Sequence, residues 1–215
     1  MSDADHMELA IYFIGFLISS EALRSVRSPR TRIVWRGLRL RHALPALVAI
    51  GLVGVATYVI ANVAPWTQWG WWSALGGQGN VAFGNVGVSL SSTEEPKWIF
   101  RFAPFLFVAA MLCYLPSAAR LEERWFRLGS ERRTRLQRVA ASLSFGLVHM
   151  IMGVPVSVAL ALGLAGWMFQ RSYLSAYERR RSRHEAIMAS THVHLAYNLI
   201  LVTLVALVLL LPHLR

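Results

Sequence analysis

Two adjacent carboxylates, Glu122 and Glu123, lie in the stretch LEERWFRLG and are the residues of this chain best suited to acid or base chemistry. Residues four apart on a helix share one face, so Glu123 and Arg127 can pair with each other. That pairing is a sufficient structural explanation for both. Glu122 points about 100° away around the helix axis and has no such local partner. We therefore expect Glu122 to be the carboxylate that is free to take up or release a proton.

Two further groups of polar residues lie in apolar surroundings. His149 follows Phe145 by one helical turn in FGLVHM, and His194 precedes Asn198 by one turn in THVHLAYN. A lone histidine in an apolar helix is more often a packing residue than a ligand, so His149 alone is a weak signal. Asn198 places an amide donor beside the His194 imidazole, which suits the binding of an oxyanion. His192 is turned off that face and is interpreted as a boundary residue.

These groups are predicted to meet at one point. His149 and His194 lie about 15 Å and about 10 Å of helix from the nearest basic boundary, so a Glu122 carried inward from the same side would reach both. A carboxylate, two imidazoles and a carboxamide can activate water and stabilise a tetrahedral oxyanion. Glu122, His149 and His194 can also bind a divalent metal such as zinc, with one position left open for water.

The composition indicates that a lipid bilayer surrounds the elements that carry these residues. The chain has 215 residues, of which 55% are hydrophobic and 15% charged, and this is too apolar for an ordinary soluble domain of that length. A long apolar stretch, 139–170, contains Gly153 and Pro155, which predict an interior hairpin of two shortened helices, 139–152 and 155–171. Four other segments are long and apolar enough to span a bilayer: 7–23, 43–64, 98–115 and 187–211.

We therefore predict an all-α fold, a polytopic transmembrane helical bundle of about six membrane helices. Residues 117–136 are too polar to span and are predicted to form an amphipathic helix at the membrane boundary, which carries Glu122. The whole chain, 1–215, forms a single integral membrane domain in this interpretation. Its motif-bearing core covers about 98–211.

The distribution of charge predicts the topology. Most of the 22 lysine and arginine residues lie in three blocks, 24–41, 120–138 and 171–183. Short basic loops beside apolar helices mark the cytoplasmic side, so we expect a multi-pass plasma (inner) membrane protein with its N-terminus outside. Contact with anionic lipid accounts for the blocks better than nucleic acid does, and no nucleic-acid partner is expected. The external loop 65–97 carries four tryptophans suited to interfacial anchoring: Trp66, Trp69, Trp71 and Trp72.

The motifs resemble those of the CPBP family of intramembrane proteases, which includes the type II CAAX prenyl endopeptidases and bacteriocin-processing relatives. The similarity covers about 100–200, roughly half of the chain. EERWFRLG also looks like the family's common EExxFRG form, with Leu128 intervening before Gly129. Three motifs occur in the family's order on successive predicted helices: Glu122-Glu123-x-x-x-Arg127, Phe145-x-x-x-His149 and His194-x-x-x-Asn198.

The resemblance implies a helical bundle around a polar chamber, in which activated water hydrolyses a peptide bond. By this resemblance Glu122 is the general base and His149 helps to hold the water. His194 and Asn198 stabilise the oxyanion. The implied substrate is a membrane-anchored or lipidated peptide or protein. Whether members of the family need zinc or work without a metal stays open at this point.

The resemblance also gives Glu123 and Arg127 the role of fixing the motif helix, consistent with their spacing. The chain departs from the family pattern at 177–186, YERRRSRHEA, which is interpreted as an inserted cytoplasmic loop where relatives often have a tight turn. Nearly all of the 22 basic residues are arginine, which indicates a bacterial source with a GC-rich genome.

Two other classes of protein are weighed against the protease. In a bis-histidine haem protein, His149 and His194 would be the axial ligands, which leaves Glu122 and Asn198 without a function. In a transporter component, the buried glutamate and histidine side chains would relay protons.

Overall fold

The described part of the chain is all-α. The structure is a computed structural model that describes residues 16–17, 19–70 and 98–210, and no strand occurs among them. The predicted span 7–23 lies mostly outside the described residues, as do Trp71 and Trp72 of the predicted loop 65–97. After a helical segment at 19–27 the described helices are α2 (Pro29–Gly37), α3 (Ala43–Val63), α4 (Trp98–Arg127), α5 (Arg135–Val148), α6 (Val156–Arg180) and α7 (Arg183–Leu210).

The central helix is α6, which contacts α3, α5 and α7. Small side chains allow helix backbones to approach closely, and the contact between α5 and α6 depends on this. A Cβ atom added at Gly146 of α5 would lie 2.1 Å from the carbonyl oxygen of Ala159. The two helices therefore touch through their backbones. The buried face of α6 is made largely of small residues: Ser157, Ala159, Ala161, Gly163, Ala165, Gly166 and Ala176.

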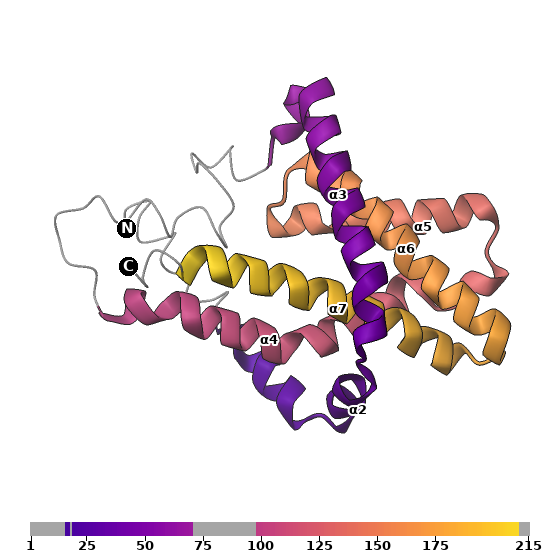
Figure 1. Ribbon diagram of the computed structural model, residues 1–215, viewed down its shortest axis with the longest axis horizontal. Coiled ribbons are helices and arrows are strands. Elements are labelled where there is room, and N and C mark those ends of the chain that lie inside the picture. The colour runs from indigo at the N-terminus through magenta and orange to yellow at the C-terminus, as the bar shows by residue number, and fades with distance from the viewer. Residues whose placement is uncertain (1–15, 18, 71–97, 211–215) are drawn as a thin grey trace.

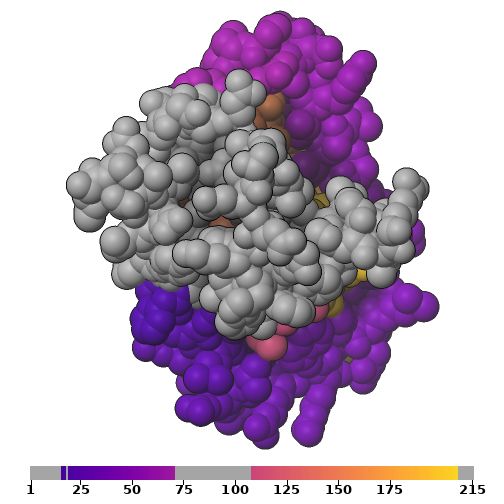
Figure 2. All heavy atoms as spheres, turned by 90° about the vertical axis from the view of Figure 1, so that its left-hand side faces the viewer, coloured from indigo at the N-terminus to yellow at the C-terminus, as the bar shows by residue number. Residues whose placement is uncertain are grey.

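The helices are not arranged as a simple bundle of parallel rods. In Figure 1, α4 and α7 run side by side, whereas α3 crosses α6 and α7. Figure 2 shows the left-hand face of that view, with the C-terminal end of α3 at the top and the helices that precede α3 at the bottom. The predicted transmembrane bundle is not confirmed by this arrangement.

Two helices are long and apolar enough to cross a membrane by length and composition, Leu40–Val63 and Arg183–Leu207. They correspond to the predicted spans 43–64 and 187–211. The first is mostly exposed, with large apolar side chains such as Leu44 on its surface, whereas the second is nearly half buried. Among the described residues no other helix meets the same criteria, so the predicted number of about six spans is not confirmed.

The predicted helix 98–115 and the first part of the predicted helix 117–136 form one helix of 30 residues, α4, and the rest of 117–136 forms a turn and the start of α5. The predicted helix boundary near residue 116 was wrong. The residues change from apolar to polar there, but the helical backbone continues. Pro116 lies inside the helix, where proline disrupts the preceding turn, and the hydroxyl of Ser25 donates a hydrogen bond to the carbonyl of Cys113 in that turn (2.7 Å). Helix α4 ends at Arg127, two residues before Gly129 adopts a φ of 81°, the left-handed conformation that favours glycine.

The predicted break in 139–170 is confirmed. Helix α5 is followed by a 3₁₀ turn, His149–Met152, and Gly153 has a φ of 86° before Pro155 caps α6. The N–H of Val156 donates to the carbonyl of Trp69 (3.1 Å) and ties the start of α6 to the segment after α3. Of the two helices of this hairpin, only α6 lies in the interior. The prediction of an interior first arm was wrong, because α5 is amphipathic and exposes residues such as Leu136.

The segment 177–186 is not a loop, and that prediction was wrong. Helix α6 continues to Arg180 and α7 begins at Arg183. Arg181 makes the turn with a φ of 53°, and its N–H donates to the carbonyl of Tyr177 (2.7 Å). This is a left-handed helix cap followed by a new helix. The segment looked like a loop because its charged side chains are exposed at two helix ends.

Candidate active site

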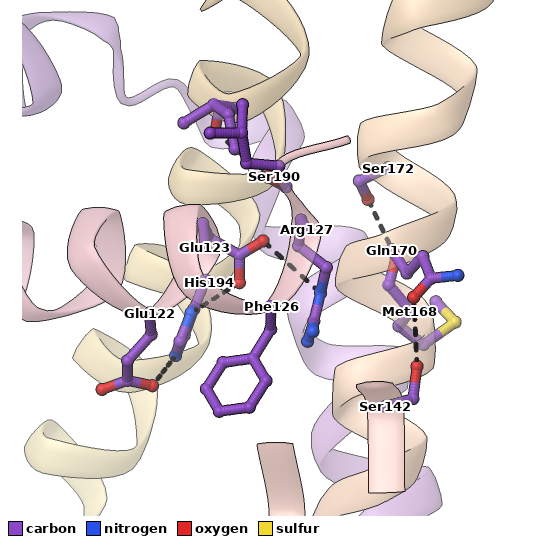
Figure 3. Close-up of polar contacts among 12 residues, drawn as sticks. Glu122, Glu123, Phe126, Arg127, Ser142, Met168, Gln170, Ser172, Ser190 and His194 are labelled. Atoms are coloured by element: carbon purple, nitrogen blue, oxygen red, sulfur yellow. Dashed lines mark hydrogen bonds and ion pairs between the residues drawn. The ribbon is translucent and has the colours of Figure 1, made fainter. Parts of the chain in front are cut away.

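The imidazole of His194 lies between the two adjacent carboxylates of α4. Its Nδ1 donates a hydrogen bond to Oε1 of Glu123 at 3.0 Å. Its Nε2 lies 3.7 Å from Oε2 of Glu122. Figure 3 shows Glu122 and Glu123 on opposite sides of the ring. The contact between α4 and α7 therefore gives each ring nitrogen its own carboxylate neighbour.

His149 approaches the same oxygen of Glu122 from another element. Its Nε2 lies 3.9 Å from Glu122 Oε2. Its Nδ1 is 2.7 Å from the carbonyl oxygen of Phe145, and a carbonyl only accepts, so Nδ1 carries the hydrogen. His149 opens the 3₁₀ turn after α5, so the helix break itself fixes the position of this imidazole. The predicted meeting of Glu122, His149 and His194 is thus observed.

The hydrogen-bond pattern leaves both Nε2 atoms facing one carboxylate oxygen. Each Nδ1 is occupied, by Phe145 or by Glu123. The separations of 3.7 and 3.9 Å from Glu122 Oε2 are too long for direct hydrogen bonds. That oxygen is buried and has no hydrogen-bond partner in the described part of the chain. A water molecule about 2.8 Å from each atom would satisfy this geometry.

Glu123 and Arg127 form the fully buried side of the site. Both side chains are 0% exposed, with Arg127 Nε 3.7 Å from Glu123 Oε2. The guanidinium also lies over the ring of Phe145, 4.9 Å from its centroid. The i, i+4 pairing predicted from the sequence is observed. The second partner of Glu123, His194, was not predicted, because pairing along one helix says nothing about contacts with another.

Aromatic rings hold the imidazoles in place. Phe169 of α6 stacks on His194 with centroids 4.4 Å apart and planes at 16°. Phe145 meets His149 edge-on at 5.0 Å and His194 at 5.4 Å. Sequence reasoning missed Phe169, because one phenylalanine in an apolar helix gives no signal that separates it from the rest of the core.

Solvent reaches the site at Glu122 and His149. The side chains of Glu122 and His149 are 25% and 21% exposed, whereas that of His194 is 2% exposed. Asn198 lies one turn beyond His194 on α7, is half-buried and makes no hydrogen bond within the described residues. His192 is turned away, as predicted, and stacks on His42 with centroids 5.1 Å apart.

A tetrahedral zinc ion would need closer donors than this arrangement provides. Two imidazole nitrogens and a carboxylate oxygen are donors that zinc accepts, but neighbouring ligands around it lie about 3.3 Å apart. Glu122 Oε2 is 3.7 and 3.9 Å from the two Nε2 atoms. No group of three His, Cys, Asp or Glu side chains in the described ranges is placed to hold a metal ion. The residues as arranged do not fit zinc, and the chemistry below uses water alone.

No family model matches this chain, and neither curated proteins nor solved structures give a significant match. The geometry around Glu122 and the resemblance of the three motifs are therefore the support for a functional proposal.

Proposed function

We propose that this protein is an intramembrane endopeptidase of the CPBP type, which hydrolyses a peptide bond of a membrane-anchored or lipidated protein with activated water. One observation carries the proposal. The unpartnered Oε2 of Glu122 lies 3.7 and 3.9 Å from two imidazole Nε2 atoms whose Nδ1 atoms are already occupied. Such a set of acceptors around one small space suits a water molecule that is about to lose a proton.

The chemistry begins with that water. Glu122 accepts one of its protons while the water oxygen forms a bond to the carbonyl carbon of the scissile peptide. His149, on the open side of the site, holds the water in line. General base catalysis of this kind contributes roughly 10² to 10⁴ to the rate.

The tetrahedral intermediate carries a negative charge on the former carbonyl oxygen. Asn198 and His194 are four residues apart on α7 and share one face, so the Asn198 amide, and His194 Nε2 when the ring is protonated at both nitrogens, can donate to the same oxyanion. The C–N bond then breaks, and the proton held by Glu122 passes to the departing amine nitrogen. Water is consumed, and a new carboxylate and a new amine are released.

Glu123 and Arg127 act by positioning in this scheme. The hydrogen bond from His194 Nδ1 to Glu123 fixes the orientation of the imidazole, at 3.0 Å. Arg127 neutralises the buried carboxylate, which would otherwise be costly to hold away from water. The pair therefore sets the position of His194 without touching the substrate.

The proposed setting is a bacterial plasma (inner) membrane. The apolar helices Leu40–Val63 and Arg183–Leu207 support a membrane location, and each begins beside arginines, which favours a cytoplasmic position for those ends. In this topology the N-terminus lies outside. A substrate reaches Glu122 from the bilayer, which agrees with a membrane-anchored or lipidated chain.

The haem alternative has less support in the geometry. An iron bound by both imidazoles would bring its porphyrin to the place where the Glu122 carboxylate lies, because Oε2 is within 3.9 Å of both Nε2 atoms. A proton relay also leaves unexplained why two acceptors and a carboxylate face one small space. We expect the purified protein to be colourless, with no Soret band.

The experiment that tests the proposal is a comparison of membrane peptides between cells that produce the protein and cells that produce Glu122→Gln. We expect one or a few membrane proteins to be cleaved only in the first. The exposed carboxylate Glu178 offers a matched control, and Glu178→Gln should leave the cleavage products unchanged. Identical peptides with the protein, with Glu122→Gln and without either protein would contradict the proposal.

A further inference from the structure

A second polar site lies away from Glu122, where the start of α3, the end of α6 and the start of α7 meet. It is a cavity of about 830 Å³. Its lining joins two of the three basic blocks of the sequence, since Arg41 comes from the first and Arg171, Arg179 and Arg180 come from the third. A membrane boundary explains why arginines lie on one side of the protein, but it does not explain their convergence on one cavity.

The positive charge in this cavity is only partly balanced. Its single carboxylate, Glu185, pairs with Arg180 at 3.3 Å. The structure gives Arg41, Arg171 and Arg179 no carboxylate partner among the described residues. A cavity lined by several guanidinium groups and one carboxylate favours an anion.

Two of these arginines are already held in position. The guanidinium of Arg171 lies over the ring of Trp167, 5.0 Å from its centroid. Arg179 donates a hydrogen bond to the hydroxyl of Ser175 at 2.5 Å. Because they are ordered in advance, less conformational entropy is lost when an anion binds.

Beside the arginines, part of the cavity lining is buried histidine and apolar surface. His42 and His192 are each 9% exposed and stack on one another. His192 Nε2 is buried without a hydrogen-bond partner in the described part of the chain. Beside the histidines the lining includes Met188 and Val193. A ligand that joins a phosphate to a hydrocarbon part fits such a lining better than a fully hydrated anion does.

We propose that this cavity binds a phosphate group, supplied by the headgroup of an anionic lipid at the cytoplasmic boundary of the membrane. Guanidinium groups bind phosphate oxygens in pairs, and basic pockets between membrane helices on this side hold lipid headgroups. The cavity lies at the basic starts of both apolar helices, which is the depth of a headgroup. This site is separate from peptide hydrolysis.

The test measures the unfolding midpoint and the bound lipid, by native mass spectrometry, of the full chain in detergent micelles. The probes are phosphatidylglycerol, phosphatidylcholine and free glycerol 1-phosphate. We expect saturable stabilisation by phosphatidylglycerol and little by phosphatidylcholine. If glycerol 1-phosphate gives the same stabilisation and displaces the lipid, the phosphate site stands and its ligand is soluble.

Variants locate the binding. Arg41→Gln with Arg171→Gln should weaken phosphatidylglycerol binding by at least about tenfold, the equivalent of about 1.4 kcal/mol. Arg132→Gln with Arg135→Gln removes the same charge from exposed residues outside the cavity and should change binding little. An equal loss in both pairs would overturn the proposal, because binding would then follow net charge alone.

One further measurement needs no variant. In the unaltered protein, excess inorganic pyrophosphate should compete with phosphatidylglycerol for the cavity. Retention of the lipid at saturating pyrophosphate, or the absence of any lipid or phosphate binding, would contradict the assignment.

Discussion

The two carboxylates beside the His194 imidazole differ in burial and in pairing: one is part of the folded core, and the other is available for chemistry. On one side Glu123 and Arg127 are 0% exposed and neutralise each other. On the other side Glu122 is 25% exposed, and its buried Oε2 has no hydrogen-bond partner among the described residues. The buried side pairs its two charges with each other, whereas the open side has a carboxylate that solvent reaches.

This difference explains why Glu122 and Glu123 are adjacent in the sequence. Consecutive residues on a helix point about 100° apart, so one carboxylate reaches the protein interior while the other reaches the opening. Both still touch the same imidazole, at Nδ1 and Nε2. Adjacent, identical side chains thus lie at opposite ends of one ring, and only Glu123 forms a hydrogen bond with it.

The largest predicted effect on stability comes from breaking the buried side. Arg127→Met leaves the Glu123 carboxylate buried without its cation, which should destabilise the fold by about 3–5 kcal/mol. Thermal unfolding of the purified protein measures this loss. Arg124→Met, on the exposed face of the same helix, is the control and should change the midpoint little. Equal effects of the two substitutions would show that the buried pair is not structural.

A second substitution should move His149, on the open side of the site, although the substituted residue is not part of the site. Gly146→Ala puts a Cβ atom 2.1 Å from the Ala159 carbonyl oxygen and should force α5 away from α6, at a cost of about 1–3 kcal/mol. Because α5 leads into His149, cleavage should fall as well. Gly51→Ala in α3 meets nothing within 4 Å and should be tolerated. Unaltered cleavage in Gly146→Ala would mean that the α5–α6 contact does not position His149.

A third substitution removes a contact that holds the His194 imidazole in place. Phe169→Leu removes the stacking on His194, which is worth about 0.5–1.5 kcal/mol. We expect turnover to fall by roughly tenfold, equal to about 1.4 kcal/mol, with a small change in the unfolding midpoint. Phe126→Leu makes the same change on a ring for which the structure records no stacking contact with either imidazole. A similar loss of turnover in both variants would argue against a specific role for Phe169.

The smallest predicted effect concerns Glu131, a carboxylate outside both sides of the site. Partial burial opposes its ionisation, but hydrogen bonds from Tyr173 (2.8 Å) and Arg183 (2.6 Å) outweigh this, so the pKa of Glu131 lies below its usual value. A lowered folded-state pKa stabilises the protein above the unfolded-state value and is lost as the pH falls through the folded-state value. Glu131→Gln should therefore cost less than about 1 kcal/mol near pH 7.

The pH dependence distinguishes this effect from simple loss of packing. The difference in unfolding midpoint between the unaltered protein and Glu131→Gln should shrink as the pH falls below the ordinary glutamate value of 4.5. A difference that stays constant down to strongly acidic pH would contradict the linkage.

The sequence predicted the features that depend on local chemistry. Hydropathy placed α3 within one residue at each end, because an apolar run bounded by polar residues is a sharp signal. Gly153 and Pro155 predicted the helix break because both residues weaken a helix directly. The i, i+4 spacing predicted the pairing of Glu123 with Arg127. The boundary near residue 116 was wrong because a change from apolar to polar residues does not stop a helix. The end of α4 was missed because the predicted helix 117–136 ran through Gly129, which favours a stop.

Features that depend on contacts between helices could not be predicted in the same way. The bond from His194 to Glu123, the stacking of Phe169 and the convergence of Arg41 with Arg171 all join different helices. Each arises from close helix contacts, and one sequence does not show which helices will meet. The depths of His149 and His194 along their predicted helices indicated that both meet Glu122, but not that both imidazoles present Nε2.

The most direct test of the contrast between the two glutamates compares Glu122→Gln with Glu123→Gln in proteoliposomes. The turnover of a substrate found by the membrane-peptide comparison and the unfolding midpoint are measured for each. We predict that Glu122→Gln lowers turnover at least about 100-fold with its midpoint unchanged, and that Glu123→Gln lowers both. Full turnover in Glu122→Gln would contradict the assignment of that carboxylate as the base.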